Sequence, residues 1–517
     1  MALAAVFLLK TFFPAWNSLN TDFPNYYTAA RAYAEGARLE QLYDWPSFQR
    51  FLRESGVTGQ QGAYAPQPPP ALLVFLPLAR LTPLAAKRVW LLLNLAFILT
   101  TYLLLRRSTG LRAWQYVALW VASYGALHTN FLYGQYYALL LFLLAVAWYA
   151  VNGRKPGAAG AALGLAAGLK LWGAPFLLYF ARLRQWRAVA AMSLAVAAMA
   201  VVSLALFGLS GNLYFVQVIL PRAFDGLLTD PYHPAFDSLT VLLRRTFVAE
   251  PTLNPDPLLA APAVFFFLRR FYLFGVLALT LLALPGDDAR RSFSWFTITL
   301  LFLAPITSSY HMLLLILPVA LLLDGCSRRG TVLLLGSLLL ATAPMEWLPP
   351  FRRTAALAVI WLWAGLPFLR RLPRRELAFV TAGVLVVAVV AGIRHTEEFR
   401  REPAQLYQAV PLPAGTLYAA APLITAAGLS YQGVDAVSPP PRSAESPDGR
   451  YLAYAERHNR STQLFLKKRA TGEVRELTPD HCNSSSPAWS PDAKTLYFAS
   501  DCNRGYGLPA LFRLQVE

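Results

Sequence analysis

Long apolar segments alternate with short polar connections over residues 1–395 of this 517-residue chain. Most of these segments approach the ~20 residues that an α-helix needs to cross a bilayer. The runs that set the pattern are Val89–Leu105, Tyr136–Val151, Ala188–Leu209, Ala263–Leu284, Met312–Leu323, Thr331–Ala343, Ala355–Leu369 and Leu377–Ile393. The pattern predicts a polytopic α-helical membrane protein with about thirteen transmembrane helices.

Polar residues interrupt two of the apolar regions. Residues 128–135, which end in the Gly134-Gln135 pair, separate residues 114–127 from residues 136–151, and Lys170 separates residues 158–168 from residues 171–180. Non-helical backbone at membrane depth is tolerated only where it is buried in protein or lines a watery cavity. We therefore expect both breaks to face the protein interior.

Two apolar segments are shorter than a full membrane span and need a separate interpretation. Residues 1–16 lack a basic start and a small-residue cleavage site, so we expect a first membrane helix rather than a cleaved signal peptide. Residues 71–81 are too short to span and are expected to extend the helix around residues 89–105.

Composition and charge agree with a membrane protein. Hydrophobic residues make up 56% of the chain and charged residues 14%, which a soluble domain could not accommodate. The net charge of +18 comes largely from arginine clusters in short connections, which mark cytoplasmic loops rather than a nucleic-acid surface. These clusters are Arg106/Arg107/Arg112, Arg154/Lys155, Arg182/Arg184/Arg187, Arg290/Arg291, Arg328/Arg329 and Arg370/Arg371/Arg374/Arg375.

The resulting topology places two long loops, about 17–70 and 210–262, on the outer face of a plasma or inner membrane. Arg352/Arg353 fall on the outer side and are exceptions to the rule. Within the first loop, Asn25–Ala37 and Trp45–Glu54 have the spacing of amphipathic helices that lie on the membrane interface.

The chain becomes polar after residue 395. Residues 396–440 read as a linker, and residues 441–517 as a small extracytoplasmic all-β segment. Ser446-Pro447-Asp448-Gly449-Arg450 recurs 44 residues later as Ser490-Pro491-Asp492-Ala493-Lys494. Each copy is a tight turn followed by alternating apolar residues, and the period resembles that of TolB-like propeller blades. Closed propellers need at least about four blades, so we expect a partial propeller that binds a protein or a glycan or self-associates.

The three cysteines constrain the chemistry little. Cys326 lies beside a predicted cytoplasmic loop and is expected to stay reduced, whereas Cys482 and Cys502 could pair if the tail is outside. A zinc site would need more ligands at shorter spacing, so no metal is expected.

Several ionisable or polar residues map to the outer half of the predicted membrane domain, where their burial is energetically costly. They are Asp22, Gln135, Lys170, Asp237, Arg244 and His311. A carboxylate with nearby cations suits a reaction in which a base deprotonates a hydroxyl while cations stabilise a departing phosphate.

Each of these residues also has a structural explanation. Asp22 could cap a helix, Lys170 could snorkel to the interface and His311 could be a packed histidine. Arg244 and Arg245 could be solvated charges, the Gly134-Gln135 pair could end a helix, and Tyr26 and Tyr27 could belong to an interfacial aromatic belt.

The order of motifs over residues 1–395 resembles glycosyltransferase family 87 of the GT-C superfamily, whose members are polyprenyl-phosphate-mannose-dependent α-mannosyltransferases and their relatives. The motifs that carry the resemblance are Asp22 to Ala30, Leu42-Tyr43-Asp44, Tyr64 to Pro70 followed by Ala71-Leu72-Leu73, Gly134-Gln135, Lys170 with Pro175, and Phe236-Asp237-Ser238-Leu239 ahead of Arg244.

The resemblance implies transfer of a hexose, mannose by analogy, from a polyprenyl-phosphate donor to a hydroxyl of a lipid or glycan acceptor. Transfer would take place on the extracytoplasmic face with inversion, without a cofactor or an obligatory metal. The implied catalytic residues are Asp22 as general base and His311; the implied donor-phosphate ligands are Lys170, Arg244, Arg245 and Gln135; and the implied cavity residues are Tyr26, Tyr27, Tyr64, Asp237 and Tyr310.

The chain departs from the family pattern at Asp237, where relatives commonly carry an amide, and in its propeller-like tail. The alternatives are a transporter or flippase of lipid-linked glycans, and a catalytically inactive scaffold that presents the tail. The sequence leaves open which sugar and which acceptor are used.

Overall fold

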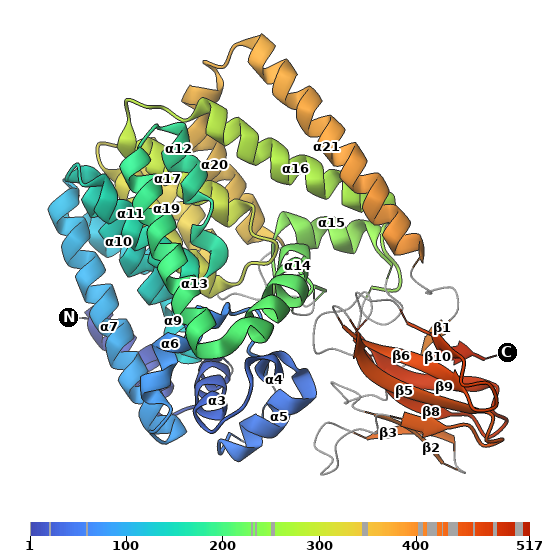
Figure 1. The fold of residues 1–517 in the computed structure, drawn as a ribbon. Coiled ribbons are helices and arrows are strands. Elements are labelled where there is room, and N and C mark those ends of the chain that lie inside the picture. Colours follow the sequence, from blue (N-terminus) through green and yellow to red (C-terminus); the bar gives the residue numbers. More distant parts are fainter. Residues whose placement is uncertain are drawn as a thin grey trace.

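The computed structural model describes residues 2–19, 22–57, 60, 62–228, 231–232, 235–249, 254–343, 350–401, 407–410, 421–425, 428–432, 443–458, 461–478, 483–501 and 510–516. Helices fill the chain up to residue 401, and strands follow (Figure 1). The α-helices are α1 Ala2–Phe7, α2 Phe13–Trp16, α3 Asp22–Ala34, α4 Leu39–Tyr43, α5 Trp45–Glu54, α6 Leu72–Phe75, α7 Pro83–Ser108, α8 Ala113–Ala122, α9 Tyr124–Tyr133, α10 Tyr137–Asn152, α11 Pro156–Leu169, α12 Phe176–Arg182, α13 Trp186–Tyr214, α14 Leu220–Asp225, α15 Leu239–Phe247, α16 Pro262–Ala283, α17 Ala289–Phe302, α18 Ile316–Leu323, α19 Arg328–Thr342, α20 Arg352–Leu369 and α21 Arg374–Arg401.

Four helical stretches of the described chain are long and apolar enough to cross a membrane: Pro83–Ser108, Trp186–Asp225, Pro262–Ala283 and Arg374–Ile393. Five shorter apolar helical stretches, of 10–17 residues, accompany them. The structure thus agrees with a helical membrane domain followed by a small all-β segment, whereas the count of thirteen spans stays a prediction.

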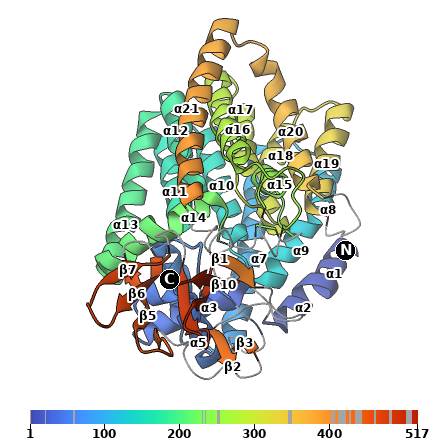
Figure 2. The same ribbon diagram turned by 90° about the vertical axis from the view of Figure 1, so that its right-hand side faces the viewer.

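Three helices of the first long loop lie at one end of the helical bundle, the end that also carries the strands (Figures 1 and 2). α5 has the predicted bounds, and its first turn is capped by Asp44, whose Oδ2 accepts a hydrogen bond from the Ser47 backbone N–H at 3.0 Å. α3 begins three residues before the predicted start, at Asp22. A carboxylate at this position is favoured by the positive end of the helix dipole.

The second predicted break, at Lys170, is present, whereas the first is shorter than predicted because residues 128–133 belong to α9. α9 ends at Tyr133, Gly134 adopts a left-handed conformation with φ of 62°, and α10 starts at Tyr137. A Cβ at Gly134 would lie 2.6 Å from the Phe23 Cβ, so a side chain there would push α3 away. Lys170 is extended between α11 and the 3₁₀ turn Leu171–Gly173.

Residues 71–81 differ from the prediction. They form α6 between the short 3₁₀ turns Pro69–Ala71 and Leu76–Leu78, and α7 begins separately at Pro83. Proline lacks the backbone N–H that a continuous helix would need and is tolerated in the first helical turn, so Pro83 starts a helix rather than continuing one.

The C-terminal strands form two four-stranded antiparallel sheets and a hairpin. Their order is β4-β5-β6-β7 in one sheet, β1-β10-β9-β8 in the other, and β2-β3 in the hairpin. The strands are β1 Tyr407–Val410, β2 Ala421–Thr425, β3 Gly428–Gln432, β4 Ser443–Glu445, β5 Tyr451–His458, β6 Ser461–Lys468, β7 Val474–Glu476, β8 Ser484–Trp489, β9 Thr495–Ser500 and β10 Ala510–Gln515. These sheets do not make a closed propeller.

The sequence repeat corresponds to two copies of one turn. The Ser446 Oγ lies 2.7 Å from the Asp448 Oδ1 and accepts from the Tyr451 N–H at 2.9 Å. The second copy repeats both bonds, with the Ser490 Oγ 2.5 Å from the Asp492 Oδ1 and 2.9 Å from the Thr495 N–H. The serine and the aspartate thus fix the same turn before β5 and before β9.

The predicted linker, 396–440, contains the end of α21, the strand β1 and the β2-β3 hairpin. β1 pairs with β10 from Tyr407 opposite Leu514 to Val410 opposite Leu511, so it completes the sheet that holds the second repeat. These strands are only four or five residues long, and the sequence analysis did not predict them. Cys482 and Cys502 lie outside the described residues, and Cys326 is a free thiol.

An ion pair joins the β segment to the helical domain. The Arg222 Nη1 on α14 lies 2.8 Å from the Asp501 Oδ2, and the Asp501 side chain is only 6% exposed. Asp501 also accepts hydrogen bonds from the backbone and side chain of Asn483. The carboxylate therefore ties the end of β9 to α14 of the helical domain.

We expect Arg222→Gln to loosen the β segment, because it leaves a buried carboxylate without its cation. In the purified full chain, trypsin should cleave the tail at least about fivefold faster, a change of roughly 1 kcal/mol in local opening. Arg450→Gln, which removes an exposed ion pair with Asp448, is the matched control and should leave the rate unchanged. Equal cleavage rates for Arg222→Gln and wild type would contradict the docking role.

Candidate active site

Asp22 lies at the start of α3, opposite the break between α9 and α10. Its Oδ2 accepts a hydrogen bond from the Gln135 Nε2 at 2.7 Å, and the Gln135 Oε1 accepts one from the Tyr26 hydroxyl at 2.6 Å. Asp22 and Tyr26 are one helical turn apart and therefore share a face of α3. Gln135 links them, which fixes the orientation of the carboxylate.

Lys170 brings a positive charge to the same place from the second break. Its Nζ lies 5.1 Å from the centroid of the Tyr136 ring and 4.5 Å from that of the Tyr137 ring. Such cation–π contacts hold an ammonium group over apolar rings without neutralising its charge. Lys170 is close enough to interact electrostatically with Asp22.

His311 reaches this cluster from the 3₁₀ turn Ser309–Leu315. Its ring centroid lies 4.7 Å from those of Tyr137 and Tyr310. The Ser308 backbone N–H donates to the His311 Nδ1 at 3.0 Å. Because a backbone N–H can only donate, Nδ1 carries no proton, and the neutral ring has its N–H at Nε2.

The carboxyl of Asp22 is poised to take up a proton. Burial raises the pKa of Asp22 to about 6, while the hydrogen bond from Gln135 and the positive charge of Lys170 act in the opposite direction. A carboxyl with this pKa is mostly ionised at pH 7 and is a stronger base than a solvated aspartate. The cluster thus combines a base, a cation and an N–H donor.

Two of the tyrosines expected in the cavity make contacts within the protein. The Tyr27 hydroxyl donates to the Leu81 carbonyl at 2.7 Å and accepts from Arg31 at 3.0 Å. Tyr64 is buried, with its ring centroid 5.4 Å from that of Tyr43. Tyr26 and Tyr310 contact the Asp22 cluster.

Asp237 binds the start of α20. Its carboxylate accepts hydrogen bonds from the backbone N–H groups of Arg353 at 2.8 Å and Thr354 at 3.3 Å, and from the Thr354 hydroxyl. The side chain is 4% exposed. These bonds account for an aspartate at this position without a substrate, because they satisfy helix N-terminal donors.

Arg244 and Arg245 lie on α15 and belong to another polar cluster. The Arg244 guanidinium lies 4.8 Å from the Phe265 ring centroid and donates to the Asp225 carbonyl at 3.2 Å. Arg245 donates to the Tyr232 carbonyl at 2.6 Å. These contacts place Arg244 between α14, α15 and α16, near the pair formed by Asp225 and Arg269, whereas the Arg245 guanidinium lies 5.3 Å from the Phe351 ring centroid.

Arg353 is a cation that the sequence reading did not select. It is 7% exposed, donates to the Ala235 carbonyl at 3.0 Å and interacts electrostatically with Tyr310 and His311. The topology predicted from the sequence places Arg353 on the outer side, against the positive-inside rule. This exception was the feature of the sequence that could have identified Arg353 as a candidate. Among the described residues, no group of three or more His, Cys, Asp and Glu could hold a metal ion.

Comparison with known proteins gives one match. Residues 67–309 match the model of glycosyltransferase family 87, a range that includes Gln135 and Lys170 and ends two residues before His311. No curated protein and no solved structure matches the chain significantly. The family match supports glycosyltransferase activity in a membrane protein.

We expect Gln135→Leu to raise the pKa of Asp22 further, because the ionised carboxylate loses a hydrogen-bond donor. A hydrogen bond to a charged group contributes about 1.5–3 kcal/mol, which corresponds to roughly one to two pH units. Infrared titration of the carboxyl band that is absent in Asp22→Asn measures the shift. Tyr26→Phe keeps the Gln135 donor and should shift the pKa less. An unchanged band in Gln135→Leu would show that this hydrogen bond does not stabilise the carboxylate.

Proposed function

We propose that this protein is a membrane glycosyltransferase that transfers a hexose, mannose in the simplest case, from a polyprenyl-phosphate donor to a hydroxyl of a lipid or glycan acceptor. The proposed reaction takes place at the outer end of the bundle and inverts the anomeric carbon. The observation that carries the proposal is the Asp22 carboxylate, held by Gln135 beside Lys170 within a chain that matches glycosyltransferase family 87.

In the proposed step, Asp22 accepts the proton of the acceptor hydroxyl. The hydroxyl oxygen forms a bond to the anomeric carbon from the side opposite the phosphate, and the bond between that carbon and the phosphate oxygen breaks. The leaving polyprenyl phosphate gains negative charge, which the Lys170 ammonium and the His311 Nε2–H are suited to stabilise. Arg353 adds a second cation beside His311.

The tyrosine rings around Lys170 support its assignment as a cation that stabilises the leaving phosphate. Tyr136 and Tyr137 shield the ammonium from water, and charges interact more strongly where water is excluded. Arg244 and Arg245 are assigned to the donor on the resemblance alone, since their described contacts are to the Asp225 and Tyr232 carbonyls. No metal takes part in the proposed step.

Asp22→Asn should lower transfer by roughly 10²–10⁴-fold, because the amide cannot accept the proton. The assay uses full-length protein in nanodiscs, radiolabelled polyprenyl-phosphate-mannose and a membrane extract as acceptor. Asp44→Asn is a matched control in the same loop, since asparagine retains the capping of α5. Wild-type transfer by Asp22→Asn would refute the base assignment, and wild-type transfer only from another lipid-linked sugar would refute mannose.

The transfer rate should rise with pH through about 6, because Asp22 acts as a base only when ionised. Its raised pKa means that the protonated, inactive form dominates below that value. Lys170→Met should move this rise of the transfer rate to higher pH, because the substitution removes the cation that lowers the pKa of Asp22. A rate profile that is flat between pH 5 and pH 7 in the wild type would assign the base elsewhere.

A further inference from the structure

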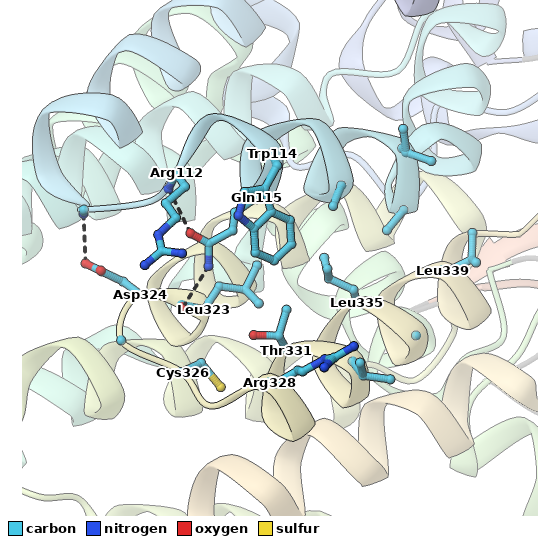
Figure 3. Close-up of a pocket in the computed structure, with 17 residues that line it drawn as sticks. Arg112, Trp114, Gln115, Leu323, Asp324, Cys326, Arg328, Thr331, Leu335 and Leu339 are labelled. Atoms are coloured by element: carbon cyan, nitrogen blue, oxygen red, sulfur yellow. Dashed lines mark hydrogen bonds between the residues drawn. The ribbon is translucent and has the colours of Figure 1, made fainter.

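A groove of about 860 Å³ lies between α8 and α19, and we call it the α8–α19 groove (Figure 3). Its lining includes no residue of the Asp22 cluster. The groove starts at the loops that follow α7 and α18 and continues along both helices to Ala122 and Leu339. These loops are among the connections that the arginine clusters place on the cytoplasmic side.

The loop end of the groove carries uncompensated positive charge. Asp324 is paired with Arg290 at 2.7 Å and accepts from the Gly110 N–H at 3.1 Å, so its charge is balanced. Arg112 and Arg328 also line the groove, and among the described residues their guanidinium groups form no hydrogen bond or ion pair. Two exposed cations therefore stand at this end.

Both bordering helices start at the same end. α8 begins after Arg112 and α19 after Ser327. The N-terminus of a helix carries partial positive charge, which favours an anion. The two helix ends and the two arginines thus contribute positive potential in the same place.

The remainder of the groove is apolar and open. Val121 and Leu339 on its walls are 44% and 50% exposed, and Val332 is 67% exposed. A Cβ added to Gly336 would meet no heavy atom within 4 Å, which shows free space beside this residue. Side chains of this kind suit a hydrocarbon chain rather than water.

The length of the groove matches one leaflet. Arg112 to Ala122 is ten residues of helix, or about 15 Å at 1.5 Å per residue. The hydrocarbon core of a bilayer is about 30 Å thick, so one leaflet contributes about 15 Å. The cations therefore lie at headgroup level when the apolar walls reach the bilayer centre.

We propose that the α8–α19 groove binds an anionic phospholipid of the inner leaflet. The phosphate lies between Arg112 and Arg328, and one acyl chain runs along α8 and α19 past Gly336. This site is separate from the proposed donor site and does not depend on the proposed function.

The test measures lipid binding to the full-length chain by native mass spectrometry. Phosphatidylglycerol and phosphatidylcholine with identical acyl chains are titrated against the delipidated protein. The double variant Arg112→Gln with Arg328→Gln should lose about 25-fold in selectivity for phosphatidylglycerol, about fivefold for each arginine. The matched control, Arg184→Gln with Arg187→Gln, changes two exposed arginines outside the groove and should retain the selectivity.

A second variant tests the acyl-chain position. Gly336→Phe fills the free space and should weaken binding of both lipids at least about tenfold. If the phenylalanine side chain prevents folding, Gly336→Leu replaces it as the test variant. Unchanged phosphatidylglycerol selectivity in the arginine variant, or unchanged binding of both lipids in the glycine variant, would overturn the proposal. Displacement of phosphatidylglycerol by equimolar polyprenyl phosphate would overturn the choice of occupant.

Discussion

Backbone polar groups have no water to bond with inside a bilayer, and this constraint determines how the two helix breaks are built. At the first break, the Trp90 indole N–H donates to the Gly134 carbonyl at 2.9 Å, and the Gln135 N–H donates to the Asn130 carbonyl at 2.9 Å. At the second, the Lys170 N–H donates to the Ala166 carbonyl at 2.9 Å. Because the backbone is satisfied in this way, the side chains of Gln135 and Lys170 are available to interact with Asp22.

The sequence was most informative where the signal was local. The helical spacing of aromatic and apolar residues predicted α5 with the bounds that the structure shows, and a glycine beside a glutamine lay in the predicted break after α9. The Ser-Pro-Asp repeat predicted two equivalent turns, because a serine and an aspartate two residues apart close the same hydrogen bonds in both copies. Each of these features depends on a few neighbouring residues.

Features that depend on contacts between distant segments were not accessible in this way. Asp237 and Arg244 have the chemistry of substrate ligands, but the described contacts of Asp237 are to a helix start more than 100 residues away. The predicted topology placed Asp22, Lys170 and His311 in the same half of the membrane domain, and the family resemblance then assigned a role to each of them. The predicted topology marked Arg353 as an exception to the positive-inside rule, but it did not indicate which residues this arginine contacts.

The strand β1 precedes all other strands of the tail in the chain, yet it lies at the edge of the sheet formed by the last three. Its partner β10 begins 100 residues after β1 ends. The second sheet can therefore be completed only when both ends of this long segment have come together. A chain that lacks β10 leaves β1 as an unpaired edge.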